Sequence, residues 1–263
     1  MTRQGRAGVA VDALAPTSGK ENAAYPWDSF DPEVYVKNNY TELRDDDRRI
    51  LQIVRDYFAG ALDPARPVET GVDVGAGANL YPMLTMLPFC RKVVLWEYGR
   101  SNVAWLQREI KSWSRRWEAF WAVLRTRRAY REVDPDQLLP ERVVVRWGNI
   151  FHLRPRQFDL GTMFFVAESI SEQRREFQTA VRRFIGALRP GAPFAAAFMQ
   201  DSSGYYVGPI PFPAVAVSKR DVKELLEPLA DDVSIFPVRS EKPLRDGYHG
   251  MILALGKAGR AKS

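Results

Sequence analysis

Two short stretches combine glycines and carboxylates at a spacing that could hold a nucleoside. The first reads Gly-Val-Asp-Val-Gly-Ala-Gly and contains Asp73, Gly75 and Gly77, and the second is an apolar stretch that ends in Glu97. Glycines at a turn let the backbone approach a ligand closely. A carboxylate that follows at this distance accepts hydrogen bonds from both hydroxyls of a ribose. Together the stretches predict a strand, a tight turn and a helix start that bind a nucleoside.

The glycine turn also separates the classes of nucleotide-binding protein. A dinucleotide-binding turn needs a third small residue where Leu80 stands, so this leucine argues against NAD and FAD. No Gly-Lys-Ser or Gly-Lys-Thr follows the glycines, which excludes a triphosphate-binding P-loop. The pattern that remains, Asp-x-Gly-x-Gly followed by Glu97, is typical of class I methyltransferases. It makes S-adenosylmethionine (SAM) the predicted cofactor.

Further candidate residues follow later apolar stretches. The third stretch leads to Asn149 and Ile150, where an adenine would lie and where the Asn149 side-chain oxygen would accept a hydrogen bond from its amino group. The fourth, over residues 158–166, carries Phe164 and is followed by Glu168. Open α/β sheets build their sites at the carboxyl ends of the strands, so we expect these side chains to gather at one edge.

The alternation of β-branched and amphipathic stretches predicts the elements that position these residues. We expect an α/β fold: a class I methyltransferase, Rossmann-like sheet of seven mostly parallel strands, with helices on both faces and an N-terminal helical lid. Strands are expected before Gly75 and at residues 91–97, 142–146, 158–166, 193–199, 233–238 and 249–255. Helices are expected to begin after Asp31 and near Leu80, and to span residues 45–58, 101–111, 112–130, 171–188 and 219–229.

Two of these helices carry side chains that have more than one interpretation. The helix that Asp31 caps carries Tyr35, and Tyr40 follows one turn further on. Both tyrosines suit either core packing or a lid over a ligand. The helix over residues 112–130 presents aromatic side chains three to four residues apart, which predicts a packed face for most of them and, for one or two, a wall of the substrate pocket. These side chains are Trp113, Trp117, Phe120 and Trp121.

The composition indicates one globular domain. Of the 263 residues, 46% are hydrophobic, which suffices for one sizeable core. Cys90 is the single cysteine, so no internal disulfide forms and a cytoplasmic setting is expected. No apolar run approaches the roughly 20 residues of a membrane span. We expect a disordered tail over residues 1–24, lid helices over 25–60, the methyltransferase domain over 61–258 and a short tail over 259–263.

The net charge of +6 raises the question of a nucleic-acid partner. The arginines are scattered, with their densest group over residues 115–131, and no recognised nucleic-acid-binding module is present. A solvated helical face explains this group, so no nucleic-acid partner is expected. His152 and His249 are isolated, which leaves no credible metal site. The oligomeric state is not readable from the sequence.

Four motifs make the chain resemble the family of small-molecule N-methyltransferases that includes the nicotinamide, phenylethanolamine and indolethylamine (thioether) methyltransferases. The resemblance covers residues 30–257. The motifs are the tyrosine-bearing lid helix (Pro32 to Tyr40), the SAM loop (Asp73 to Tyr81), the acid of the second strand with its tyrosine and asparagine (Glu97, Tyr98 and Asn102), and the loop over the substrate (Ser202 to Gly208).

The resemblance implies which residues contact the cofactor. These are Tyr35, Tyr40, Gly75, Tyr81, Glu97, Asn102, Asn149 and Ile150. The same motifs and strands add Asp73, Gly77, Tyr98 and Phe164 to the predicted set. Glu97 and Asn149 stand where the family usually has aspartate, but both keep an acceptor oxygen, so we expect SAM binding to be retained.

The substrate side departs further from the family. Amine-methylating members carry an acid after the fourth strand, which Glu168 matches, and a second acid at the end of the fifth strand. Here that second position is Met199, followed two residues later by Asp201. The methyl acceptor is therefore expected to differ from the familiar ones. The resemblance implies that Tyr205 and Tyr206 close over it.

We predict methyl transfer to a small molecule, at a nitrogen of an amine, a guanidine or an N-heteroaromatic group. Glu168 and Asp201 would anchor that nitrogen beside Met199. Glu168 also has a purely structural interpretation, as a carboxylate near the N-terminus of the helix that begins at about residue 171. Alternatives are an oxygen, sulfur or carbon acceptor, an RNA methyltransferase, and a SAM-binding protein without catalysis.

Overall fold

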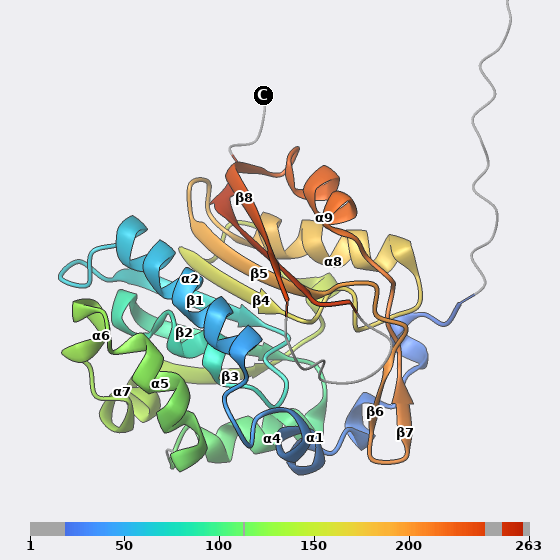
Figure 1. The fold of residues 1–263 in the computed structure, drawn as a ribbon, viewed down its shortest axis with the longest axis horizontal. Coiled ribbons are helices and arrows are strands. Elements are labelled where there is room, and N and C mark those ends of the chain that lie inside the picture. The colour runs from blue at the N-terminus through green and yellow to red at the C-terminus, as the bar shows by residue number, and fades with distance from the viewer. Residues whose placement is uncertain (1–18, 113, 240–248, 260–263) are drawn as a thin grey trace, which may run out of the picture.

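A seven-stranded sheet forms the centre of the computed structural model, which describes residues 19–112, 114–239 and 249–259 (Figure 1). Its strands are β1 (Val68–Val74), β2 (Cys90–Glu97), β3 (Val143–Trp147), β4 (Leu160–Phe164), β5 (Pro193–Met199), β8 (Ala230–Val238) and β9 (Met251–Ala258). Their order is β3-β2-β1-β4-β5-β9-β8, and β9 alone runs antiparallel to its neighbours. The predicted sheet of seven mostly parallel strands is confirmed.

Helices cover both faces of this sheet (Figure 1). They are α1 (Pro32–Asn39), α2 (Asp45–Ala61), α3 (Tyr81–Leu84), α4 (Arg100–Glu109), α5 (Glu118–Leu124), α6 (Arg128–Arg131), α7 (Pro135–Arg142), α8 (Arg174–Ala187) and α9 (Lys219–Leu226). Side chains alternate between the faces of a strand. Ala195 and Ala197 of β5 therefore pack with α2 and α5, whereas Phe194 and Ala196 pack with α8 and α9.

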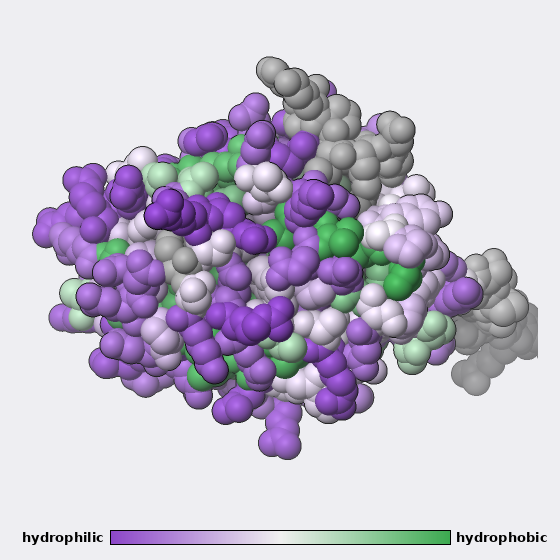
Figure 2. Space-filling view, turned by 90° about the horizontal axis from the view of Figure 1, so that it is seen from below, coloured by the Kyte–Doolittle hydropathy of each residue, from purple (hydrophilic) through white to green (hydrophobic). Residues whose placement is uncertain are grey.

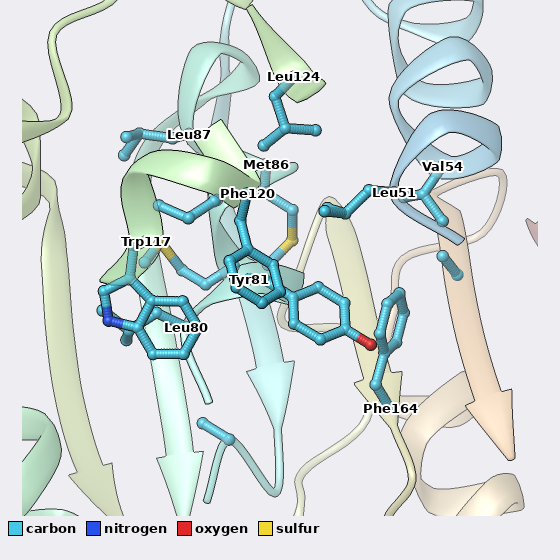
Figure 3. Close-up of a cluster of buried hydrophobic side chains, with 14 of the residues drawn as sticks. Leu51, Val54, Leu80, Tyr81, Met86, Leu87, Trp117, Phe120, Leu124 and Phe164 are labelled. Carbon is cyan, nitrogen blue, oxygen red and sulfur yellow. The ribbon is translucent and has the colours of Figure 1, made fainter. Parts of the chain in front are cut away.

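The helix α2 belongs to the core layer and not to a lid. Its apolar stripe, which includes Leu51 and Val54, faces the aromatic cluster around Tyr81 and Phe120 (Figure 3). The stripe is fully buried. The helix continues to Ala61, three residues beyond its predicted end at residue 58. The predicted lid is thereby reduced to the segment around α1.

The helix expected over residues 112–130 is interrupted. A 3₁₀ turn (Arg115–Trp117), α5 and α6 take its place, and Trp113 lies outside the described residues. The Thr126 hydroxyl donates to the carbonyl of Val123 at 2.8 Å, which competes with the helical hydrogen-bond ladder at the break. The predicted aromatic face is nevertheless buried. The side chain of Asp134 caps the next helix, α7, where it accepts from the Asp136 N–H.

A hairpin was not predicted in the loop after β5. Strands β6 (Tyr205–Val207) and β7 (Ile210–Phe212) pair with each other and with no other strand in the part of the chain that the structure describes. Gly208 takes a positive φ of 57° at the first central position of the two-residue turn, as hairpin turns of this kind require. Strands of three residues are too short to show a clear alternation.

The N-terminal segment that the structure describes is packed against α8. The Asn22 N–H donates to Glu176 Oε2 at 2.7 Å, and the indole of Trp27 donates to the Asn22 carbonyl. The expectation of a disordered tail up to residue 24 is therefore wrong for residues 19–24. The rest of that tail, and residues 260–263 of the expected C-terminal tail, lie outside the described residues.

Two segments form what we call the roof, residues 27–39 with α1 and residues 205–212 with the hairpin. They meet through aromatic rings: Trp27 and Phe30 each lie 5.2 Å from the ring of Phe212, and Tyr35 lies 6.4 Å from Tyr205. The face shown in Figure 2 is mainly hydrophilic, with hydrophobic residues in separate patches. Among the described helices, none is long and apolar enough to cross a membrane.

Candidate active site

The turn after β1 has a geometry that favours glycine. Gly75 and Gly77 have φ angles of 67° and 57°. A Cβ atom on Gly75 would lie 2.4 Å from Cγ1 of Val166, well inside van der Waals contact. The Gly75 N–H donates to the Trp96 carbonyl at 2.7 Å, which holds the turn against the end of β2. The backbone is therefore open to a ligand at the place where the sequence predicts it.

Glu97 is the acid at the end of β2, and it is buried. Its Oε2 accepts from the N–H of Gly77 at 2.8 Å and its Oε1 accepts from the N–H of Gly99 at 2.7 Å. Burial raises the pKa of Glu97, while these N–H groups and the side chain of Asn102 oppose that shift. The carboxylate thus joins the glycine turn to the start of α4.

A cavity opens at the carboxyl ends of β1 to β4, and we call it the strand-end cavity. Its empty volume, which includes space open to solvent, is about 780 Å³. The predicted residues that line it are Tyr35, Tyr40, Gly75, Gly77, Glu97, Tyr98, Asn102, Asn149, Ile150 and Phe164. Other lining residues were not predicted, among them Trp27 of the roof and Phe165 and Ser169 of the loop after β4. Tyr205, which was predicted on the substrate side, lines this cavity as well.

Asn149 and Ile150, the residues of the predicted adenine corner, both line the strand-end cavity. Asn149 Oδ1 accepts from the Phe151 N–H at 2.9 Å and so caps a short 3₁₀ turn (Ile150–His152). The oxygen that we assigned to an adenine amino group is therefore already used once, although a carbonyl oxygen has a second lone pair. Ile150 is buried and supplies an apolar wall to the cavity.

Two residues predicted to contact the cofactor line neither this cavity nor the one beside it. Tyr81 is fully buried, and its hydroxyl donates to Asp47 Oδ1 at 2.8 Å. Its ring stacks on Phe120, as Figure 3 shows. Asp73 accepts a hydrogen bond from Thr162 at 2.7 Å, and burial raises its pKa to about 8. Both side chains are therefore buried among other residues of the protein.

A second cavity, which we call the adjoining cavity, continues from the first. It has an open volume of about 460 Å³, and its described lining is Tyr35, Asn39, Tyr40, Asp47, Phe165, Ser169, Met199, Tyr205 and Met251. Five of these residues also line the strand-end cavity: Tyr35, Tyr40, Phe165, Ser169 and Tyr205. The two cavities therefore share a wall.

The two acids predicted to anchor the substrate line neither cavity. Glu168 is fully buried, and its Oε1 accepts from the N–H of Met199 at 2.9 Å. It does not cap the following helix, because Gln173 occupies that position in α8. Asp201 is partly exposed and faces Gln200 and His249. An anchoring role for either carboxylate remains a prediction.

The other residues predicted to contact the substrate lie partly inside and partly outside the adjoining cavity. Tyr205 and Met199 line the adjoining cavity as expected, whereas Tyr206 is 71% exposed and lines only an open groove beside the hairpin. Tyr40 is buried and packs on Tyr81, so it is part of the core as well as of the wall. The arrangement supports both interpretations of the paired tyrosines.

Asp47 is the acid that the sequence analysis missed. Its side chain is 2% exposed and lines the adjoining cavity. A signal was available: Asp47 stands three, four and seven residues before the buried Ile50, Leu51 and Val54 of the apolar stripe. An acid on the buried stripe of a helix is a candidate functional residue.

This sheet and this glycine turn define a class I SAM-dependent methyltransferase. The pattern of the NNMT/PNMT/TEMT family matches residues 20–251, so the chain belongs to this family. Phenylethanolamine N-methyltransferase from Homo sapiens is 23% identical over 246 residues, 85% of this chain and 84% of that protein, and the Macaca mulatta enzyme is 22% identical over 84% and 83%.

Two solved structures show the same fold. The N-methyltransferase NodS from Bradyrhizobium japonicum WM9, in complex with S-adenosylhomocysteine, aligns with a TM-score of 0.51 at 15% identity, over 87% of this chain and 97% of that one. The magnesium protoporphyrin IX methyltransferase ChlM from Synechocystis PCC 6803, with bound SAM, aligns with a TM-score of 0.54 at 8% identity, over 85% and 89%.

The residues present fit SAM. The glycine turn leaves room for the ligand backbone, and Glu97 lines the cavity where ribose hydroxyls can donate to it. Asn102 Oδ1 is buried at the same wall and accepts no hydrogen bond from any residue that the structure describes. An acceptor left unpaired at a cavity wall suits a donor on a bound ligand. When bound, SAM supplies a methyl group that is activated by its sulfonium charge.

Proposed function

We propose that this enzyme transfers the methyl group of SAM to a nitrogen of a small amine or N-heteroaromatic molecule held in the adjoining cavity. The observation that carries the proposal is the shared wall of the two cavities. An acceptor in the adjoining cavity lies next to a cofactor in the strand-end cavity, and the rings of Tyr35, Tyr40 and Tyr205 exclude water from the contact.

The lining of the adjoining cavity favours a neutral or cationic acceptor. Tyrosine faces attract cations, and the thioethers of Met199 and Met251 supply an apolar wall. The described lining contains one carboxylate and neither lysine nor arginine. An acidic acceptor would therefore meet no opposite charge from these residues. The phenylethanolamine N-methyltransferases among the relatives support nitrogen as the acceptor atom.

The protein need not activate the methyl group. Its task is to align a lone pair with the bond that breaks, and such alignment can contribute up to roughly 7–11 kcal/mol. The wall shared by Tyr35, Phe165 and Ser169 fixes the position of one molecule against the other. Alignment and exclusion of water are what this site offers.

Matched acceptors test the proposal. The purified chain is incubated with methyl-labelled SAM and with 2-phenylethylamine, 2-phenylethanol, 2-phenylethanethiol or tRNA, one at a time. We expect label to be transferred to the amine. Transfer only to the alcohol, the thiol or tRNA would replace nitrogen by the corresponding acceptor. Binding of SAM without transfer to any small molecule, including a wider panel of amines and N-heteroaromatics, would contradict the proposal.

A further inference from the structure

The buried acid of the adjoining cavity is Asp47, in the first turn of α2. Its Oδ1 accepts from the Tyr81 hydroxyl at 2.8 Å. Its second carboxylate oxygen accepts no hydrogen bond from the residues that the structure describes. The side chain is 2% exposed, and its surroundings in the cavity are tyrosine rings and methionine thioethers. A carboxylate in such a place is costly to bury unless a ligand pairs with it.

The favourable interaction of an acid with the N-terminus of a helix does not by itself explain why Asp47 lies buried at a cavity wall. Three aspartates begin α2, and any of them can interact with the helix dipole. Asp45 does so while exposed to solvent. Asp46 is buried but pairs with Arg44 at 3.3 Å and accepts from the Asp47 N–H at 2.9 Å. Of the three, only Asp47 lines a cavity.

We propose that Asp47 is the acceptor-binding carboxylate of this enzyme and that it takes a proton from the ammonium group of the acceptor. The inference rests on the proposed function, because it assumes an amine in the adjoining cavity. It gives that amine a carboxylate partner in the cavity that Met199 also lines, and Met199 stands where the family resemblance implies the second acid. The acid comes from α2 and not from the end of β5.

The proton and charge balance is simple. An N–H bond of the acceptor R–NH₃⁺ breaks, and its proton moves to the Asp47 carboxylate. The freed lone pair of R–NH₂ then forms the N–CH₃ bond as the S–CH₃ bond of the cofactor breaks. The products are a methylated ammonium ion, a neutral thioether and protonated Asp47, which returns its proton to solvent. The net charge is +1 before and after.

The groups around Asp47 suit this role. Burial raises the pKa of Asp47 to about 7, and the charge of Asp46 adds to the shift, while the Tyr81 hydrogen bond and Arg44 oppose it. The phenols of Tyr40 and Tyr81 also face Asp47, but their pKa values lie well above the ordinary value, so both stay protonated near neutral pH. A carboxylate that titrates near the working pH can take up a proton and release it.

The test is the pH dependence of kcat/KM for 2-phenylethylamine. Asp47→Asn keeps the size of the side chain and an oxygen for the Tyr81 hydroxyl. At about pH 7 we expect kcat/KM to fall by roughly ten-fold or more. The kcat/KM of the wild type should increase with pH around pH 7, as Asp47 loses its proton. The variant should not show this increase. The difference should narrow as the pH approaches the pKa of the amine, where the free amine needs no base.

Asp45→Asn is the matched control, because it removes an exposed acid from the same helix turn. It should keep the wild-type profile. Tyr81→Phe is a second variant that keeps the carboxylate and removes the hydrogen bond that lowers its pKa. The increase near pH 7 should then move to higher pH, and this result does not depend on whether Asp47→Asn folds.

Binding measurements distinguish a failure of the role proposed for Asp47 from a failure of the proposed function. In calorimetry, Asp47→Asn should bind SAM as the wild type does, and its complex with S-adenosylhomocysteine should bind 2-phenylethylamine more weakly. Wild-type kcat/KM and an unchanged increase near pH 7 in Asp47→Asn would overturn the role of Asp47 and leave the proposed function intact. A wild-type complex that binds and methylates no amine, but methylates an alcohol or thiol, would overturn both.

Discussion

The carboxylate of Glu168 accepts a hydrogen bond from the backbone N–H of Met199, with 2.9 Å between Oε1 and the nitrogen. This contact joins the segment after β4 to the last residue of β5. Met199 lines the adjoining cavity, whereas Glu168 does not. The contact therefore fixes the end of β5 that presents Met199 to the adjoining cavity.

Substitutions of Glu168 should therefore change the position of the end of β5 more than the charge of the acceptor site. Glu168→Ala leaves the Met199 N–H unpaired in a buried place, which costs roughly 1–3 kcal/mol of unfolding free energy. Glu168→Gln keeps an acceptor oxygen and should lose much less. We expect the alanine variant to raise the KM for the acceptor and to leave SAM affinity unchanged in calorimetry. A large loss of kcat/KM in a stable Glu168→Gln would favour the anchoring role instead.

The glycine turn gives a second prediction. Gly75→Ala places a Cβ atom against Val166 and forces a left-handed backbone on alanine. The strain costs about 1–2 kcal/mol for the backbone and about 1–3 kcal/mol for overpacking. Urea unfolding should show this loss, and SAM affinity should fall with it. Gly60→Ala is the control: its Cβ meets nothing within 4 Å, and it should stabilise α2 by about 0.5–1 kcal/mol.

Removal of the acid at the end of β2 tests the ribose contact. Glu97→Ala removes a charge-assisted hydrogen bond that is worth roughly 1.5–3 kcal/mol, so SAM affinity should fall by about ten- to a hundred-fold in titration calorimetry. Glu69→Ala, in the exposed start of β1, removes an acid that pairs with Arg91 at the surface and should leave the affinity unchanged. Equal SAM affinity in the Glu97 variant and the wild type would refute the assignment.

The pKa of Asp73 predicts how stability changes with pH. Burial raises this pKa from 3.8 to about 8, so the folded state holds the proton more tightly than the unfolded state. The stability that this group contributes is complete below the unfolded pKa and is lost as the pH rises toward about 8. In Asp73→Asn this dependence is absent. Urea unfolding at about pH 5 and about pH 8 should therefore show the wild type losing stability relative to the variant; a constant difference would contradict the shift.

The sequence predicts the cofactor side well because its signals are local. The strand before Gly75, the turn itself and Glu97 lie within one stretch of chain, and the structure places them as predicted. The residues Asp73 and Tyr81 belong to the same stretch but point into the core. A motif places a residue in a segment, but burial decides whether its side chain reaches the ligand.

The acceptor side could not be predicted in the same way. Asp47, Met199, Tyr205 and Met251 come from four elements that are far apart in the chain, and only tertiary packing brings them together. The hairpin gave no signal because its strands have three residues each. The break after α5 was missed because a threonine side chain competes locally with a helical pattern.

The hairpin of the roof has a consequence for how new specificities can arise. Its two strands pair only with each other among the described strands, so a change in the length or sequence of its turn leaves the register of the main sheet intact. The hairpin still contributes Tyr205 to both cavities. Evolution or protein design can therefore replace this short hairpin by another of different length or sequence. The enzyme would then accept a substrate of different shape while the core around the main sheet stays packed as it is.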